Sequence, residues 1–299
     1  MSVERLTPGD PRYPPALMLL AAPPQQLYAQ GDLSLLARPR VSVIGSRTPS
    51  AYGETVAFDA AKALASKGAV IVSGMARGLD ACAHAGALDA GGGTIAILGT
   101  GLDIDYPRGN RHLLAEVRRT GLVLSEYELG DGPLKWHFPA RNRIIAALAQ
   151  VLLVVEGRLE GGTSNTVRWA LDVEARIFGV PGRLGDELAE SPNSLIRDCG
   201  TIYTHPNDIL LELGLPVFPE KPRNRSELQR RIAAARLARE HLSGAEATLF
   251  DLVGPRPVHV DELAAKSEID PGLLLAALSS LELQGLVTQL PGKHFLLAS

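Results

Sequence analysis

The alternation of short apolar runs with helical patterns constrains the fold of this chain more than any other feature of its sequence. The first run, 41–44, is β-branched and apolar, as expected of a strand buried on both faces of a parallel sheet. A glycine turn, 45–47, and a helical pattern at 54–67 follow it. This order of strand, turn and helix recurs along the chain and predicts an α/β fold with a doubly wound, mostly parallel sheet. The other expected strands are 69–72, 94–98, 122–124, 151–155 and 176–180, and the other expected helices are 81–90, 111–119, 143–149 and 166–174.

Small and polar residues follow the carboxyl ends of these strands, where a doubly wound sheet binds its ligands. A strand, a glycine turn and a helix start direct free backbone N–H groups at an anion. The planar guanidinium of Arg47 suits phosphate or base edges. Each segment alone could be ordinary turn chemistry, but together they predict a polyanion or a nucleotide-like ligand. The segments are 45–50, 73–80, 99–110, 125–143 and 156–164.

Motifs for metals and common cofactors are missing from the sequence. The glycine spacing matches neither GxGxxG nor a P-loop, and Cys82 and Cys199 form no CxxC pair. Asp80 and His84 stand four residues apart on an expected helix and could form a metal or acid–base pair. Because no third ligand has a metal-like spacing, a hydrogen-bonded structural pair is the favoured interpretation. We expect no cofactor, no metal and no catalytic residue.

Charge and hydropathy limit the partners and the location of the chain. The formal net charge of its 299 residues is −3, so a nucleic-acid partner needs a local basic surface. The N-terminus lacks an apolar segment of the signal-peptide kind. The longest apolar stretch, 144–155, is too short to span a bilayer and contains Gln150. We therefore expect a cytoplasmic protein without a membrane segment.

Composition divides the chain into four expected parts. A proline-rich lead-in, 1–40, is expected to pack on the main domain, 41–215, and 216–243 reads as a linker with a charged helix. The last part, 244–299, has three expected helices followed by a two-stranded wing, which is the pattern of a winged helix.

The expected winged helix is acidic, with seven acidic and three basic residues and a formal charge of −4. Its would-be recognition helix, 270–284, contains no Lys or Arg. Because phosphate neutralisation supplies most non-specific DNA affinity, a protein contact is favoured over duplex DNA. The acidic residues are Glu246, Asp251, Asp261, Glu262, Glu268, Asp270 and Glu282.

The main domain resembles the DNA-processing protein A (DprA/Smf) family. The matching motifs run in family order over residues 8–213 and are specific when taken together. They are IGSR with SAYG (44–53), SGMARGLDACAH (73–84), GGTIAILGTGLDIDYP (92–107), SEY (125–127), FPARNRII (138–145) and VPG (180–182).

The resemblance implies an extended Rossmann-like domain that binds single-stranded DNA. It also implies a homodimer that delivers the strand to the RecA recombinase in natural transformation. A winged-helix tail occurs in this family too. Some members carry an additional N-terminal helical module, for which this chain is expected to begin too close to Val41. One departure is that the chain reads GGTSNTV at 161–167, where members commonly read SGSLITA.

The expected DNA contacts are of two kinds: groups that bind phosphates, and an aromatic ring that can stack on a base. Backbone amides at 45–46 and 73–74 are expected to hold phosphates, with Arg47 as the main anchor. Phe138 could stack on an unpaired base, or could belong to the core. One of Arg141 and Arg143 could instead tie loops together. Phosphate contacts and stacking ignore base identity, so little sequence preference is expected. The full set is Gly45, Ser46, Arg47, Ser73, Gly74, Arg108, Lys135, Phe138, Arg141, Asn142 and Arg143.

Two other functions fit the sequence less well. A nucleotide phosphoribohydrolase of the lysine decarboxylase-like type needs a PGGxGT loop and a glutamate soon after it. The segment 161–163 has no preceding proline, and the next glutamate is Glu174. Glu126 and Glu156 could serve a hydrolase, or could pair with Arg47 or Arg143. A duplex-reading regulator that uses the tail is disfavoured by the acidity of the tail.

Overall fold

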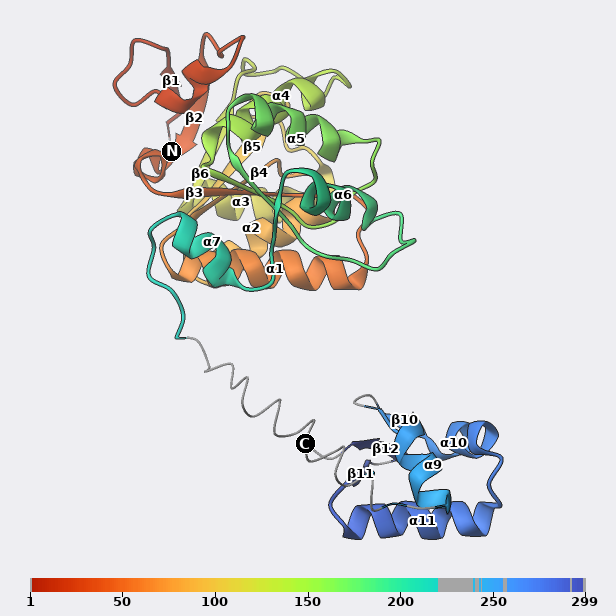
Figure 1. The fold of residues 1–299 in the computed structure, drawn as a ribbon. Coiled ribbons are helices and arrows are strands. Elements are labelled where there is room, and N and C mark those ends of the chain that lie inside the picture. Colours follow the sequence, from red (N-terminus) through yellow and green to blue (C-terminus); the bar gives the residue numbers. More distant parts are fainter. Residues whose placement is uncertain are drawn as a thin grey trace. The chain divides into compact units, whose positions relative to one another are not determined.

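The computed structural model describes residues 2–219, 239, 242, 244–254, 257–290 and 292–297. The chain divides into two units, Met1–Pro219 and Glu220–Ser299, and each is described by itself (Figure 1). The expected linker and charged helix, 216–243, lie almost wholly outside the described residues. The finer division into four parts stays a prediction.

The larger unit is built on one nine-stranded sheet. Its central strands pair in parallel, with Val41 opposite Val151 on one side and opposite Ile71 on the other. Each of the six expected strands is present, and the α/β fold class is confirmed. In spatial order the strands are β1 (Glu4–Leu6), β2 (Leu27–Gly31), β6 (Leu122–Ser125), β5 (Thr94–Leu98), β4 (Val70–Ser73), β3 (Arg40–Ile44), β7 (Val151–Val154), β8 (Arg176–Gly179) and β9 (Thr201–Ile202).

The first forty residues extend this sheet as well as packing on it. β2 pairs antiparallel with β6, and β1 pairs antiparallel with β2. At Gly31 the backbone φ is +121°, and a β-carbon would lie 2.2 Å from the carbonyl oxygen of Gly121, so the close approach of β2 requires glycine there. Two 3₁₀ helices, η1 (Pro15–Leu19) and η2 (Leu33–Ala37), complete the segment.

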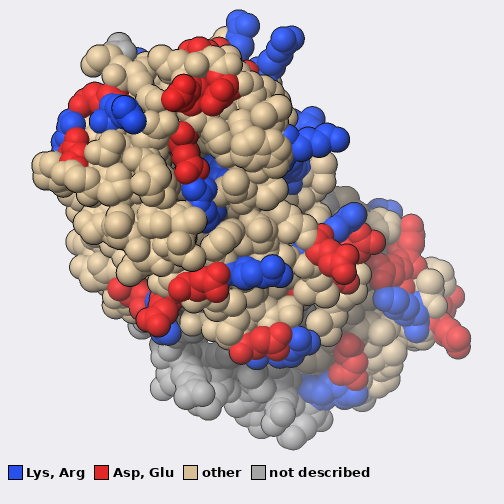
Figure 2. Space-filling model, turned by 90° about the horizontal axis from the view of Figure 1, so that it is seen from above, with Lys and Arg blue, Asp and Glu red and all other residues tan. Residues whose placement is uncertain are grey.

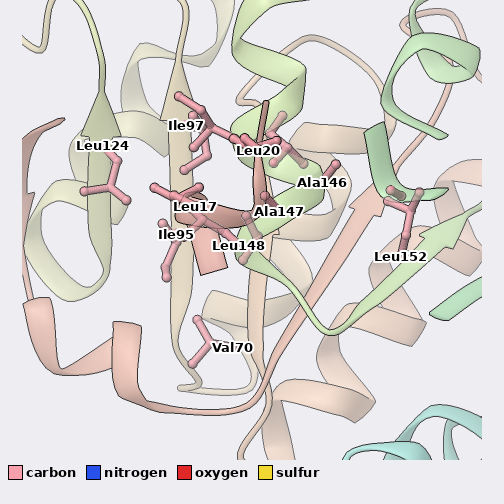
Figure 3. Close-up of a cluster of buried hydrophobic side chains, with 14 of the residues drawn as sticks. Leu17, Leu20, Val70, Ile95, Ile97, Leu124, Ala146, Ala147, Leu148 and Leu152 are labelled. Atoms are coloured by element: carbon pink, nitrogen blue, oxygen red, sulfur yellow. The ribbon is translucent and has the colours of Figure 1, made fainter. Parts of the chain in front are cut away.

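Helices cover both faces of the sheet (Figure 1). One face carries α1 (Ala51–Ser66), α2 (Leu79–Asp89), α3 (Arg111–Thr120) and α7 (Pro206–Glu212). The other carries α4 (His137–Leu148), α5 (Gly162–Asp172) and α6 (Glu190–Asp198). Figure 3 shows part of the core on the second face, a cluster that includes Leu17 of η1, Leu148 of α4 and Ile97 and Leu152 of the sheet. Burial of these side chains holds α4 over the strand ends that form the candidate site.

Helix α4 begins six residues before the expected start at Arg143. Pro139 lies in its first turn, where backbone N–H groups have no intrahelical acceptor and proline is tolerated. Phe138, Arg141 and Asn142, which were expected on a loop, therefore lie on a helix.

The smaller unit forms the expected winged helix. Its elements are α9 (Gly244–Leu252), β10 (Val258–His259), α10 (Val260–Ser267), α11 (Pro271–Leu283), β11 (Val287–Leu290) and β12 (His294–Leu297). The buried core of this unit includes Leu249, Leu263 and Leu278. Asp270 caps α11, and His259 caps α10, because a ring nitrogen of His259 accepts from the N–H of Asp261.

Candidate nucleic-acid interface

Two adjoining cavities open at the carboxyl ends of the central strands. The larger, of about 430 Å³, lies between the β3–α1 turn and the start of α5. The smaller, of about 60 Å³, lies between the β4–α2 loop and the start of α4. Arg47, Ala76 and Arg141 line both cavities. The sheet edge predicted to bind a ligand is thus hollowed at the expected place.

Arg47 and Phe138 come together at the rim of these cavities. Arg47 is exposed, and its guanidinium carbon lies 5.7 Å from the centroid of the Phe138 ring. The Tyr106 ring lies 5.3 Å from the same ring. A β-carbon on Gly99 would approach the Phe138 ring to 2.9 Å, so glycine makes room for it. Phe138 is half-buried and lines the smaller cavity, and so does not lie in the core.

The β3–α1 turn is held by its neighbours while its amides stay available. A β-carbon on Gly45 would meet the carbonyl oxygen of Glu156 at 2.7 Å. The carbonyl of Ser46 accepts from the N–H of Leu79. Among the described residues, nothing accepts from the N–H groups of Gly45 and Ser46. The turn therefore offers two donors beside Arg47 at the larger cavity.

The N-terminus of α1 is not the anion site that the sequence indicates. The N–H of Ser50 donates to the Glu156 carboxylate at 3.0 Å, and the Ser50 hydroxyl donates to it as well. The Ser50 hydroxyl also caps the helix by accepting from Gly53. Glu156 is 5% exposed. The chain thus supplies its own anion at this helix start, which excludes a phosphate there.

The start of α5 is open instead. Its N-cap, Gly161, makes no side-chain capping bond, and Gly162 and Thr163 line the larger cavity. Asn142 donates from α4 to the carbonyl of Gly162 at 3.3 Å. The sequence places 156–164 among the segments that predict a ligand, but none of its residues was among the expected DNA contacts. The uncapped first turn of α5 makes this segment a second set of backbone donors.

Ser73 and Gly74 serve the fold, which corrects their expected role. Ser73 is buried, and its hydroxyl donates to the carbonyl of Val43 at 2.7 Å. The N–H of Gly74 donates to Asp80 at 3.1 Å, and Ala76 donates to the same oxygen at 3.2 Å. The Gly74 amide is therefore occupied and cannot hold a phosphate.

Arg141 is a buried tie between strand ends that also lines both cavities. It is 3% exposed, and its guanidinium donates to the carbonyls of Gly74 and Ile97. Burial lowers the pKa of Arg141 to about 10, while attraction to Asp80 acts in the opposite direction. The guanidinium is charged at neutral pH and contributes a fixed positive charge beneath the site.

Arg143 has a structural role: it links α4 to the loop after β6 and to the N-terminal segment. It donates to both oxygens of Glu126, at 2.6 and 2.8 Å, and to the carbonyls of Ala140 and Ala22. It lines neither of the two cavities. The hypothesis that Glu126 pairs with Arg143 is confirmed. Glu156 binds Ser50 instead, and among the described residues it forms an ion pair with neither Arg47 nor Arg143.

Three further exposed cations follow the strands β4, β5 and β6. Arg108 and Lys135 are exposed and lie outside the lining of the two cavities, and no described carboxylate pairs with them. Arg77, which the sequence did not place in the site, is exposed and lines the smaller cavity. Tyr106 was missed as well, because no pattern in the sequence reveals that its ring packs on Phe138.

Asp80 and His84 have separate structural roles. The Nδ1 of His84 lies 2.7 Å from the Thr94 hydroxyl, which donates to the carbonyl of Ile71. Burial lowers the pKa of His84 to about 3, so the ring is neutral at physiological pH. Within the part of the chain that the structure describes, no three His, Cys, Asp or Glu side chains could hold a metal ion.

Charge on the surface is mixed. In the view of Figure 2, Lys and Arg side chains lie beside Asp and Glu in small groups separated by uncharged surface. Ion pairs of the larger unit include Arg12 with Glu4 and Arg158 with Glu187. Arg47, Arg77, Arg108 and Lys135 have no carboxylate partner among the described residues, which is also true of exposed arginines elsewhere, such as Arg5 and Arg183. No helix in the described ranges has the length and apolarity to cross a membrane.

The fold is a Rossmann-like domain joined to a winged helix, and exposed cations and aromatic rings lie at the carboxyl ends of its central strands. The model of the family DNA recombination-mediator protein A matches residues 4–214, and the DprA winged helix domain matches residues 221–293. The chain belongs to the DNA recombination-mediator protein A (DprA) family.

Known relatives support this assignment over most of the chain. Protein Smf of Escherichia coli is 35% identical over 293 residues, which are 97% of this chain and 76% of that protein. DNA processing protein DprA of Streptococcus pneumoniae is 40% identical over 203 residues, which are 68% of this chain and 72% of that protein.

Solved structures agree with the fold. The X-ray structure of DprA from S. pneumoniae superposes with a TM-score of 0.68 at 38% identity, and covers 73% of this chain and 76% of that one. DprA from Helicobacter pylori superposes with a TM-score of 0.65 at 33% identity, and the match covers 71% of this chain and 95% of that one. The H. pylori structure is described as showing a single-stranded DNA binding mode of that protein.

Proposed function

We propose that this chain binds single-stranded DNA without sequence preference, protects the strand and delivers it to the RecA recombinase, without cleaving it. The observation that carries the proposal is the placement of Arg47 over Phe138 beside Tyr106. The H. pylori relative, whose structure is described by its single-stranded DNA binding, supports it.

The chemistry of the rim suits an unpaired strand better than a duplex. An aromatic ring can stack on a base only when the face of that base is free, and the bases of a duplex stack on each other. Arg47 and the amides of Gly45 and Ser46 provide donors for the phosphate next to that base. Because every base has a ring face and every nucleotide a phosphate, this site distinguishes strandedness and not sequence.

A binding role is also supported by how the carboxylates near the strand ends are used. Glu126 is bound by Arg143, Glu156 by Ser50, and Asp80 by the amides of Gly74 and Ala76. Each carboxylate holds loops in place, as a scaffold for binding requires. The family's description as a recombination mediator supports delivery to a recombinase. We further propose that the chain acts as a homodimer.

The proposal is tested by fluorescence anisotropy with labelled oligo-dT and a duplex of equal length. We expect oligo-dT to bind at least about tenfold more tightly, with an affinity that falls steeply as salt rises. Equal affinity for both, or turnover of a nucleoside monophosphate by the purified protein, would contradict the proposal.

Delivery is tested separately from binding. We expect the chain to speed assembly of RecA on oligo-dT that is already covered by a single-strand binding protein. An Arg47→Ala variant is expected to lose this effect together with its DNA affinity. If the wild-type chain binds oligo-dT but leaves RecA assembly unchanged, delivery is wrong and binding stands.

A further inference from the structure

The loop before α4 presents a second large aromatic ring to solvent. Trp136, the N-cap residue of α4, is 63% exposed, far more than is usual for tryptophan. We propose that Trp136 is a second stacking platform for an unpaired base of the strand that Phe138 and Arg47 hold. This inference rests on the proposed function and adds a binding residue to that site.

The Trp136 ring is held from one side by a rigid aromatic pair. His137 and Tyr127 stack with ring centroids 3.7 Å apart, and Trp136 meets both at near right angles, 4.1 Å from His137 and 6.2 Å from Tyr127. His137 is 3% exposed, and its Nδ1 lies 3.1 Å from the carbonyl of Gly99. The indole is thus fixed at its base while most of its surface contacts solvent. A platform held in advance lowers the entropy lost on binding.

The order of the strands places the residues that contact the two aromatic rings at neighbouring strand ends. Tyr127, which supports Trp136, follows β6, and Gly99, which supports Phe138, follows β5. Arg47 follows β3. Because the spatial order is β6-β5-β4-β3, a strand crossing this edge meets Arg47, then Phe138, then Trp136. The distance from β3 to β6 is about 14 Å at about 4.8 Å per strand, which leaves room for more than one base.

A neighbouring cation indicates which class of ligand the Trp136 ring binds. Lys135 is exposed directly before Trp136, and no carboxylate in the described ranges pairs with it. Leu129 and Leu134 are exposed on the same loop, so an apolar protein surface is the competing occupant. An aromatic ring beside an unpaired ammonium suits alternating bases and phosphates, whereas a purely apolar partner would leave Lys135 uncompensated.

The chain offers a direct optical test, because Trp136 and Trp169 are its only two tryptophans. In a Trp169→Phe protein, all tryptophan emission comes from Trp136. This protein is titrated with labelled oligo-dT while tryptophan emission and label anisotropy are recorded together. We expect the emission to be quenched with the same midpoint as the rise in anisotropy, because a stacked base contacts the indole.

Substitutions at position 136 supply the second measurement. In the full chain, Trp136→Leu is expected to weaken oligo-dT binding about fivefold to tenfold, and Trp136→Phe is expected to retain most of the affinity. A structural role at the start of α4 would not produce base-dependent quenching of the unsubstituted ring.

The outcomes separate the inference from the proposed function. If anisotropy rises while Trp136 emission stays constant, the strand binds elsewhere on the rim, and the inference is wrong although single-strand binding stands. If anisotropy does not rise at all, the proposed function itself fails. If the Trp136→Leu variant misfolds, the quenching experiment on the Trp169→Phe protein still tests the inference.

Discussion

The rim of the large sheet and the winged helix both expose apolar side chains, but their charges differ. At the rim, the rings of Tyr106 and Trp136 lie among exposed cations that have no described carboxylate partner. On α11 the exposed side chains are leucines, at 273, 275 and 283, and the helix contains no Lys or Arg. Aromatic rings beside unpaired cations suit a single strand, whereas an aliphatic, acidic surface suits a protein partner. Exposed apolar area alone does not identify the partner.

The largest expected effect belongs to Arg47. Arg47→Ala is expected to weaken oligo-dT binding about tenfold to a hundredfold, because a charged donor to phosphate is lost. The slope of log affinity against log salt is expected to fall by about 0.7, the value for one phosphate of a single strand. Anisotropy titrations over a salt series measure both quantities.

Arg119→Ala is the matched control for that measurement. Arg119 lies in the last turn of α3 and pairs only with Glu116 on the same helix. Its removal changes the net charge equally and is expected to leave binding unchanged within about twofold. Similar losses in the two variants would show that bulk charge, and not the rim, holds the strand.

Phe138 is expected to contribute next. Phe138→Leu keeps an apolar side chain but loses the ring face, and we expect about a tenfold loss of oligo-dT affinity. Phe138→Tyr keeps the face and is expected to bind nearly as the wild type does. Competition titrations with unlabelled oligo-dT measure this difference. If the tyrosine variant is as weak as the leucine variant, the ring supports the fold and not a base.

Arg143 is expected to change stability and not binding. Arg143→Ala leaves Glu126 half-buried without its partner, so the free energy of unfolding is expected to fall by about 1–3 kcal/mol. The folded variant is expected to bind oligo-dT within about threefold of wild type. Denaturant unfolding and anisotropy, measured on the same protein, separate the two effects. A loss of binding as large as that of Arg47→Ala would place Arg143 at the strand after all.

The smallest effect is expected for the winged helix. A chain ending at Leu242 is expected to bind oligo-dT within a few-fold of the full chain, because acidic residues outnumber basic ones by seven to three in the winged helix and disfavour phosphate contacts. Anisotropy with oligo-dT measures the comparison. A collapse of affinity would remove the distinction between the two regions, and would show that the acidic unit takes part in DNA binding.

The sequence predicts the strands and the winged helix well because both depend on local patterns. Apolar runs such as 151–155 identify buried strands, and the helices between them follow from their spacing. The start of α4 was missed because Pro139 reads as a helix breaker, although the first turn tolerates it. β1 and the antiparallel pairing of β1 and β2 with the sheet were not predicted, because such short segments carry little apolar signal.

Which arginines face a ligand could not be predicted, because their partners are distant in the sequence. Arg141 and Arg143 are two residues apart, yet one binds the carbonyls of Gly74 and Ile97 and the other binds Glu126. The same holds for helix starts. The start of α1 carries a strong local signal for an anion site, but Glu156, which follows β7, binds Ser50 there and occupies it. Only the fold shows that the start of α5 is the open one.

The location of the bound strand tests the central claim most directly. Oligonucleotides carrying bromodeoxyuridine are cross-linked by light to the full chain, and the modified peptides are identified by mass spectrometry. We predict cross-links at Tyr106, Trp136 or Phe138, on the rim beside Arg47. Cross-links confined to the winged helix, or to helices at the opposite edge of the sheet, would contradict the account.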